Sequence, residues 1–298
     1  MVTLEEGRPL PRDMPREGLG SLPFVVVGLR RGEVERRWLE LCDVVVEDGD
    51  PALHRIEENV AAHPVTATTL ALLLRGQHRQ SVGEGLVAES AAYSVLQSGP
   101  EFAAWRAAHP ARADRDKGPR VRVDRAGDIL SVTLTRPDRL NALDALMRDE
   151  LVEALAVAAA DTGIARVEWR GEGRAFCAGG DLDEFGTRPD PATAHLIRLE
   201  RSVGRALSRL RTPTVTHLHG ACMGSGIELA AFTDSVVAAA DTQIALPEIG
   251  LGLVPGAGGT VSLPRRIGRL RTAWLAFSGS TIDAALAHEW GLVDELGP

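Results

Sequence analysis

Residues 219–268 have the sequence HGACMGSGIELAAFTDSVVAAADTQIALPEIGLGLVPGAGGTVSLPRRIG. A glycine-rich turn at residues 220–226 leads directly into a stretch that favours a helix, IELAAF. Glycine allows the backbone to approach a ligand closely, and a helix N-terminus adds a partial positive charge that favours an anion. Two backbone N–H groups that converge on one carbonyl oxygen form an oxyanion hole. A glycine-rich turn alone is equally compatible with an ordinary connection.

The first of the two glycine-rich turns along the chain lies upstream, at residues 171–181, with the sequence GEGRAFCAGGD. It follows ARVEWRG, a predicted short strand, just as the second turn, at residues 220–226, follows TPTVTHLHG. DILSVTLTR alternates apolar and polar residues, as a half-buried strand does. Helical patterns over residues 143–160 and 195–210 separate these strands. Repeated strand, turn and helix units predict an α/β protein.

Two carboxylates accompany the turn at residues 220–226. Glu228 lies in the first turn of the predicted helix, and Glu248 follows twenty residues later in ALPEIGLG. Apolar neighbours and Pro247 favour burial of Glu248 and a raised pKa. Two such groups beside an oxyanion hole could hold a water molecule and move its protons. Their spacing leaves a simpler alternative open, in which Glu228 only interacts with the helix dipole and Glu248 is an exposed turn residue.

Three segments accompany residues 219–268. RPDRLNALD (136–144) precedes both glycine-rich turns, FCAGGDL (176–182) overlaps the end of the turn at residues 171–181, and GSTIDAALAHEWGLVDEL (279–296) comes last. Together they resemble the crotonase (enoyl-CoA hydratase/isomerase) superfamily over roughly residues 122–296. The resemblance implies a spiral of ββα units, assembled as a trimer or a pair of trimers. It also implies a thioester substrate carried by coenzyme A, or sometimes by pantetheine on a carrier protein, with no separate cofactor.

The resemblance assigns roles to four residues. Gly180 and Ser225 match the two oxyanion-hole donors; the family usually has glycine at the second position, but the donor is the backbone N–H. Glu228 and Glu248 match the two glutamates of hydratases, of which the first helps to deprotonate water and the second protonates Cα. This pair favours a 2-enoyl-CoA hydratase. An isomerase or a specialised biosynthetic thioester enzyme needs only one glutamate, and a catalytically silent CoA-binding subunit is a further alternative.

Contacts with the substrate follow from the same resemblance. Arg139 matches a basic residue near the CoA phosphates, although a surface arginine without a ligand is an equal alternative. Asp183 stands where many hydratases have a lysine near the adenosine. The acyl-pocket candidates are Leu182, Phe185, Leu253 and Val254, and ordinary core packing is the alternative for each. The complete set of expected substrate and CoA contacts is Arg139, Ala178, Asp181, Leu182, Phe185, Leu253 and Val254.

The helices that follow GLVDEL in the family are missing from this position, but residues 51–109 resemble them. SVGEGLVAESAAYSVLQSGPEFAAWRAA is similar to the closing helices, and Ser81 with Glu84 predicts a capping box. We therefore expect a permuted helical cap over this core or a neighbour's; an unrelated helical adaptor is the alternative. The expected organisation is a loosely ordered N-terminus (1–22), a mainly helical region (23–109), a linker (110–118) and a crotonase core (119–298).

Composition limits the partners. The net charge of −8 argues against nucleic acid or an anionic membrane. No stretch approaches the ~18 to 20 apolar residues that span a bilayer, and the N-terminus lacks the apolar region of a signal peptide. The three cysteines show no metal-binding spacing, so we expect no metal and a reduced, cytoplasmic protein. A core without its usual helices would expose an apolar face, so a homo-oligomer is expected.

Overall fold

The structure, a computed structural model, describes residues 1–5, 22–112, 118–187 and 190–297. Its largest sheet has six strands in the order β12-β9-β7-β6-β5-β4. All neighbours are parallel except β4 and β5, which form an antiparallel pair. Buried and partly exposed residues alternate along β5, as the pattern of DILSVTLTR predicts. The strands are β4 (Val121–Ala126), β5 (Ile129–Leu134), β6 (Arg166–Gly171), β7 (Thr214–Leu218), β9 (Ser235–Ala238) and β12 (Glu295–Leu296).

A smaller sheet, in the order β11-β10-β8, lies where the glycine-rich turns meet. It consists of β8 (Ala221–Met223), β10 (Gln243–Ala245) and β11 (Ile282–Asp283). Strand β8 begins inside the second glycine-rich turn and pairs in parallel with β10. Because β10 ends three residues before Glu248, this pairing brings Glu248 back towards the turn that precedes Glu228.

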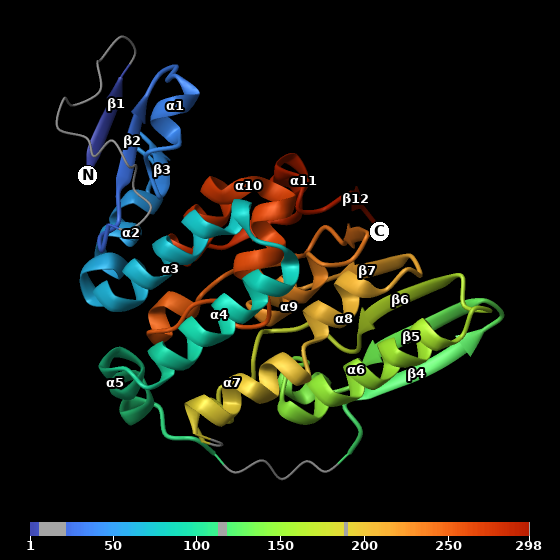
Figure 1. Ribbon diagram of the computed structural model, residues 1–298. Helices are drawn as coiled ribbons and strands as arrows, with labels where there is room; N and C mark the ends of the chain where they lie inside the picture. Colours follow the sequence, from blue (N-terminus) through green and yellow to red (C-terminus); the bar gives the residue numbers. More distant parts are fainter. Residues whose placement is uncertain (6–21, 113–117, 188–189, 298) are drawn as a thin grey trace.

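Helices pack around these sheets (Figure 1). Residues 195–210, predicted as one helix, form two, because Ser202 begins a new helix by accepting a hydrogen bond from the Arg205 N–H at 3.2 Å. Helix α6 begins after Asp144, whose side chain accepts from the Met147 N–H. The helices of this part are α6 (Ala145–Ala160), α7 (Pro191–Glu200), α8 (Val203–Arg209), α9 (Ser225–Ala230), α10 (Gly259–Ser278) and α11 (Ala284–Trp290), with short 3-10 turns η2 (Pro137–Arg139) and η3 (Glu248–Leu251).

The N-terminal part begins with a small parallel sheet, β1-β2-β3, formed by Val2–Glu5, Val27–Arg31 and Val44–Glu47, with α1 (Arg36–Leu39) beside it. Strand β1, at the edge of this sheet, lies in a segment (residues 1–22) that we expected to be loosely ordered, so this part of the expectation was wrong. Leu4 is buried against Trp38 and Cys42, and this apolar contact fixes the strand. Residues 6–21 of the expected loose segment and residues 113–117 of the expected linker lie outside the described residues.

Four helices follow: α2 (Ala52–Ala62), α3 (Pro64–Gly76), α4 (Val82–Gln97) and α5 (Pro100–Ala108), with η1 (Gln77–Arg79) between α3 and α4. The capping box predicted at the start of α4 is confirmed, since Ser81 and Glu84 exchange backbone and side-chain hydrogen bonds.

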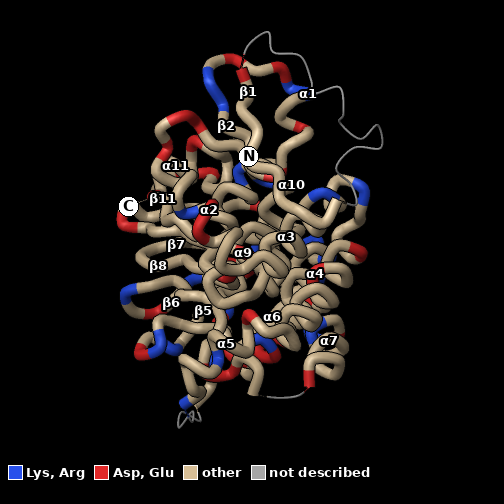
Figure 2. The backbone as a smooth tube through the Cα atoms, turned by 90° about the vertical axis from the view of Figure 1, so that its left-hand side faces the viewer, with Lys and Arg blue, Asp and Glu red and all other residues tan. Residues whose placement is uncertain are grey.

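These helices cover the core of their own chain (Figures 1 and 2). Helix α4 contacts α7 and α10, and α5 contacts η3. The Asn59 side chain donates to the carbonyl of Phe277 at 2.9 Å, and Arg106 donates to the carbonyl of Leu182 at 2.6 Å. Segments from opposite ends of the sequence therefore share one apolar core.

Candidate active site

The two glycine-rich turns lie side by side. Cys177 donates its N–H to the carbonyl of Ala221 at 3.1 Å, and Met223 donates back to the carbonyl of Cys177 at 3.0 Å. The second turn depends on Gly224, whose φ of 46° is unfavourable for other residues and where a Cβ would collide with the Glu248 carboxylate. Among the described residues, the N–H groups of Gly180 and Ser225 have no hydrogen-bond acceptor. Both residues line the same cavity, so two free backbone donors face it.

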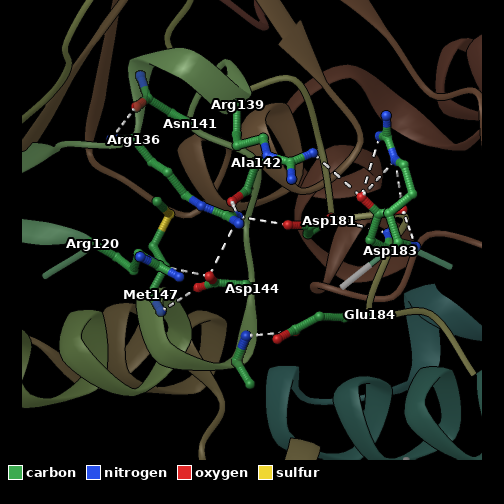
Figure 3. Close-up of polar contacts among 12 residues, drawn as sticks. Arg120, Arg136, Arg139, Asn141, Ala142, Asp144, Met147, Asp181, Asp183 and Glu184 are labelled. Atoms are coloured by element: carbon green, nitrogen blue, oxygen red, sulfur yellow. Dashed lines mark hydrogen bonds and ion pairs between the residues drawn. The ribbon is translucent and has the colours of Figure 1, made fainter. Parts of the chain in front are cut away.

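The segment RPDRLNALD holds the first turn in place (Figure 3). Buried Arg136 pairs with Asp181 at 2.6 Å and with Asp144 at 3.3 Å. The Asn141 amide donates to the carbonyls of Glu172 and Ala175, at 2.9 and 2.8 Å. These hydrogen bonds hold Asn141 in a left-handed conformation, with a φ of 53°. The segment thus acts as a brace for the turn that carries Gly180.

Glu228 lies on α9, directly after the second turn, and only 2% of its surface is exposed. Its Oε2 accepts hydrogen bonds from the N–H groups of Ala257 and Gly259, both at 2.8 Å. Burial raises the pKa of Glu228 to about 7, although these two donors favour the charged form. A carboxyl group with this pKa can take up and release a proton near neutral pH.

Glu248 lies at the start of η3 and is 8% exposed. Its Oε2 is buried and has no hydrogen-bond partner among the described residues. Burial, and then the charge of nearby Glu228, raise the pKa of Glu248 well above its ordinary value. The two groups therefore differ: Glu228 has donors that stabilise its charge, whereas Glu248 favours its protonated form.

A third buried carboxyl group comes from the N-terminal part of the chain. Glu89 of α4 accepts from the N–H of Gly258 at 2.7 Å and from the N–H and hydroxyl of Thr260 at 2.8 and 2.7 Å. Glu228 and Glu89 thus bind alternate N–H groups of residues 257–260, at the start of α10. Burial, and then the charge of Glu228, raise the pKa of Glu89 to about 8. Glu89 fixes the loop that orients Glu228.

These groups surround a cavity of about 970 Å³. Gly180, Asp181, Phe185, Ser225, Glu228 and Glu248 all line it, so the structure brings together all four residues expected to carry the chemistry. Leu253 and Val254 are instead fully buried in the apolar core. Leu182 is 46% exposed, and Ala178 donates its N–H to the carbonyl of Leu140. Neither of them lines this cavity, and of the expected acyl-pocket residues only Phe185 does.

Arg139 lies at the rim of the cavity and its guanidinium pairs with Asp183 at 3.3 Å (Figure 3). Arg112, from the N-terminal part, binds the same carboxylate at 3.2 Å. The pKa of Asp183 is lowered, first by the hydrogen bond from the Arg112 N–H. Asp183, at the position where many hydratases have a lysine, is therefore an anion held between two arginines.

Three residues that line the cavity were not predicted from the sequence: Glu89 and Tyr93 of α4, and Arg198 of α7. Arg106 of α5, which binds the carbonyl of Leu182, was not predicted either. One signal was present: Glu89, Ser90 and Ser94 are polar residues on the side of α4 that is buried. Buried polar groups in an amphipathic helix commonly have a specific partner. Among the described residues, no cluster of His, Cys, Asp and Glu is suited to a metal ion, and no helix is long and apolar enough for a bilayer.

Known proteins resemble the part of the chain that carries both glycine-rich turns. The family model described as enoyl-CoA hydratase/isomerase matches residues 124–298, more than half of the chain. The 2,3-dehydroadipyl-CoA hydratase of Escherichia coli (strain K12) is 37% identical over 59% of this chain and 68% of its own. The 1,2-epoxyphenylacetyl-CoA isomerase of the same strain is also 37% identical, over 55% of this chain and 64% of its own. The crystal structure of an enoyl-CoA hydratase from Thermoplasma volcanium GSS1 superposes with a TM-score of 0.57, at 34% identity, covering 60% and 72% of the two chains.

The fold and the paired turns define an enzyme of the crotonase type. The chain belongs to the enoyl-CoA hydratase/isomerase family. The matched region begins at residue 124, so Glu89 and the other contributions of α2 to α5 come from outside it.

Proposed function

We propose that the protein adds water across the double bond of a 2-enoyl-CoA thioester. The proposal rests on one arrangement: two buried carboxyl groups of different character line a cavity with two free backbone N–H groups. The N–H groups of Gly180 and Ser225 would bind the thioester oxygen and stabilise the enolate that develops there.

The contrast between the glutamates supports a division of roles. Glu228, with two donors on its carboxylate, would accept a proton from water while the oxygen bonds to Cβ. The electron pair of the double bond would move into the enolate. Glu248, with a raised pKa and an unpartnered oxygen, would supply the proton to Cα. One proton is accepted and one is donated, so a subsequent exchange between the two groups restores the starting state.

The CoA moiety would lie towards Arg139, at the rim of the cavity. Its phosphates would compete with Asp183 for that guanidinium. No separate cofactor enters this scheme. We also propose that the protein is cytoplasmic and a homo-oligomer, a trimer or a pair of trimers; light scattering of the purified protein tests the assembly.

The direct test follows the loss of enoyl absorbance with crotonyl-CoA. Glu248→Gln is expected to lower kcat by about 10²- to 10⁴-fold, because it removes the proton donor. Glu153→Gln, at an exposed position on α6, is the matched control and keeps full activity. Turnover that survives in Glu248→Gln would contradict the proposal.

Isomerisation is the second candidate, because a relative named as an isomerase matches at the same 37% identity as the hydratase. Incubation with a 3-enoyl-CoA separates the two activities, since an isomerase would increase the enoyl absorbance. Binding of CoA thioesters without turnover, unchanged in Glu248→Gln, would instead indicate a silent CoA-binding subunit.

A further inference from the structure

A polar pair interrupts the apolar part of the cavity wall. Tyr93 of α4, the only tyrosine of the chain, lies under the guanidinium of Arg198 of α7, whose Cζ is 4.8 Å from the ring centroid. The wall contains the apolar residues Leu86, Val87, Ile197, Val203 and Leu229, and also the polar residues Glu89, Ser90, Arg148, Arg201 and Arg205. Polar groups at such a position commonly fix the orientation of a ligand.

Arg198 is held firmly in place by α4. Its Nε donates to the Ser90 hydroxyl at 3.1 Å, and its Nη2 donates to the Ser90 carbonyl at 3.2 Å and to the Ser94 hydroxyl. Its remaining nitrogen, Nη1, has no acceptor in the described part of the chain. The geometry therefore presents a fixed guanidinium with one free edge.

Neither member of the pair has a full set of partners in the described part of the chain. No carboxylate there forms an ion pair with the partly buried Arg198, although Glu89 lies near enough to favour its charge. The Tyr93 hydroxyl makes no hydrogen bond among the same residues, although Tyr93 is only 7% exposed and buried tyrosine hydroxyls normally find an acceptor. Both groups line the cavity, so a bound molecule can supply the missing acceptors.

The pair lies close to the reacting centre. The Tyr93 ring packs edge-on against Phe185, at 6.4 Å between centroids, and Phe185 in turn lies against Gly180. On another side the Tyr93 ring packs against Gly256, next to the loop that binds Glu228. A group bound by Tyr93 and Arg198 would thus belong to the acyl part of a thioester held at Gly180.

We propose that Tyr93 and Arg198 form a subsite for a carboxylate on the acyl chain, so that CoA thioesters of dicarboxylic acids are the preferred substrates. This inference rests on the proposed function. Nη1 of Arg198 and the Tyr93 hydroxyl donate to the two carboxylate oxygens. The anion forms the ion pair that Arg198 lacks among the described residues.

Two thioesters of equal chain length test the subsite: 2-hexenoyl-CoA and 2-hexenedioyl-CoA, which differ in a terminal carboxylate. The wild-type protein is expected to have a kcat/KM for the dicarboxylic substrate higher by about ten- to hundredfold, the range of a hydrogen bond to a charged group. Arg198→Gln lowers this ratio at least tenfold, Tyr93→Phe lowers it less, and Arg198→Lys retains most of it. Arg209→Gln, exposed on α8, leaves the ratio at its wild-type value.

Binding of the saturated esters, adipyl-CoA and hexanoyl-CoA, by calorimetry separates the subsite from the chemistry. If neither enoyl ester is hydrated but adipyl-CoA binds more tightly in an Arg198-dependent manner, the proposed function fails and the subsite stands. Equal kcat/KM values for both enoyl esters, or an equal loss for both in a folded Arg198→Gln variant, overturn the subsite.

Discussion

At the residue scale, the site is defined by what each carboxyl group touches. Glu228 and Glu89 share four successive N–H groups at the start of α10, while Glu248 keeps a buried oxygen without a partner. Three acids packed this closely cannot all be ionised near neutral pH. The arrangement therefore holds a proton donor and a proton acceptor together.

Glu89→Gln tests whether α4 acts on the chemistry. The side-chain NH2 of the glutamine would face the backbone N–H groups of Gly258 or Thr260, so that donor opposes donor. This loosens the loop that orients Glu228, and kcat is expected to fall. The loss of one negative neighbour also lowers the pKa of Glu248. The alkaline limb of the profile of kcat/KM against pH therefore moves to lower pH.

Glu84→Gln is the matched control, because it is an exposed residue on the same helix. It weakens only the capping box and leaves the pH profile in place. A Glu89→Gln variant with lower stability but an unchanged alkaline limb would restrict Glu89 to a purely structural role.

The sequence predicted Glu228 and Glu248 because each lies within a short motif. It could not predict Glu89, since its partner Thr260 is 171 residues away and periodicity carries no information about such contacts. For Leu253 and Val254, the local sequence pattern was visible but led to a wrong prediction. Both follow Glu248 in an apolar segment, but that segment turns inward at Gly252, which has a φ of 71°, and buries them in the core.

At the scale of elements, buried polar contacts join the N-terminal sheet to the helices. Arg75, in the last turn of α3, binds both carboxylate oxygens of Asp43 at 2.7 Å. Asp43 directly precedes β3 and also accepts from the N–H of Val26. Arg269 of α10 donates to the carbonyl of Cys42 at 2.7 Å. Helices α3 and α10 thus both bind the segment at residues 42–43 that leads into β3.

Arg75→Met is expected to weaken the attachment of this sheet, because it leaves the buried Asp43 carboxylate without its counter-charge. The cost of removing one partner of a buried pair is about 3–5 kcal/mol. Arg31→Met removes exposed pairs with Glu5 and Asp48 and should cost at most about 1 kcal/mol. Hydrogen exchange of the β2 and β3 amides measures the local stability of the sheet in both variants. Similar protection in the two would contradict the proposed role of the Arg75–Asp43 pair.

At the scale of the whole molecule, residues from both ends of the sequence line the candidate site. Residues 1–123 lie outside the matched family region, yet their helices supply part of the cavity wall, brace the loop that orients Glu228 and contact the 3-10 turn that carries Glu248. The permuted cap expected from the sequence therefore lies over the core of the same chain. Which chain it would cover was not predictable, because short-range patterns do not distinguish contacts within a chain from contacts between chains.

The pH dependence of stability should show the free-energy cost of burying the three carboxyl groups of this site. Glu89, Glu228 and Glu248 have pKa values raised above the ordinary 4.5, so the native state binds more protons than the unfolded state above that pH. The free energy of unfolding is therefore expected to fall as pH rises from about 4.5 to about 8. Urea unfolding at pH 5 and pH 8 measures the change.

Glu228→Gln should reduce this fall, because it removes one of the raised pKa values and lowers the other two. Glu153→Gln, outside the site, should show the wild-type dependence. A free energy of unfolding that is constant or rises over this range would contradict the raised pKa values.

The helical cap also has a consequence during translation. Helix α4 is synthesised before the loop at residues 257–260, which carries the N–H groups that bind Glu89. At about 5–20 residues per second, the 171 residues from Glu89 to Thr260 take roughly 10 to 30 s. Over a delay of that length the apolar surfaces of α3 and α4 have no core to pack against, so the nascent chain is expected to bind chaperones.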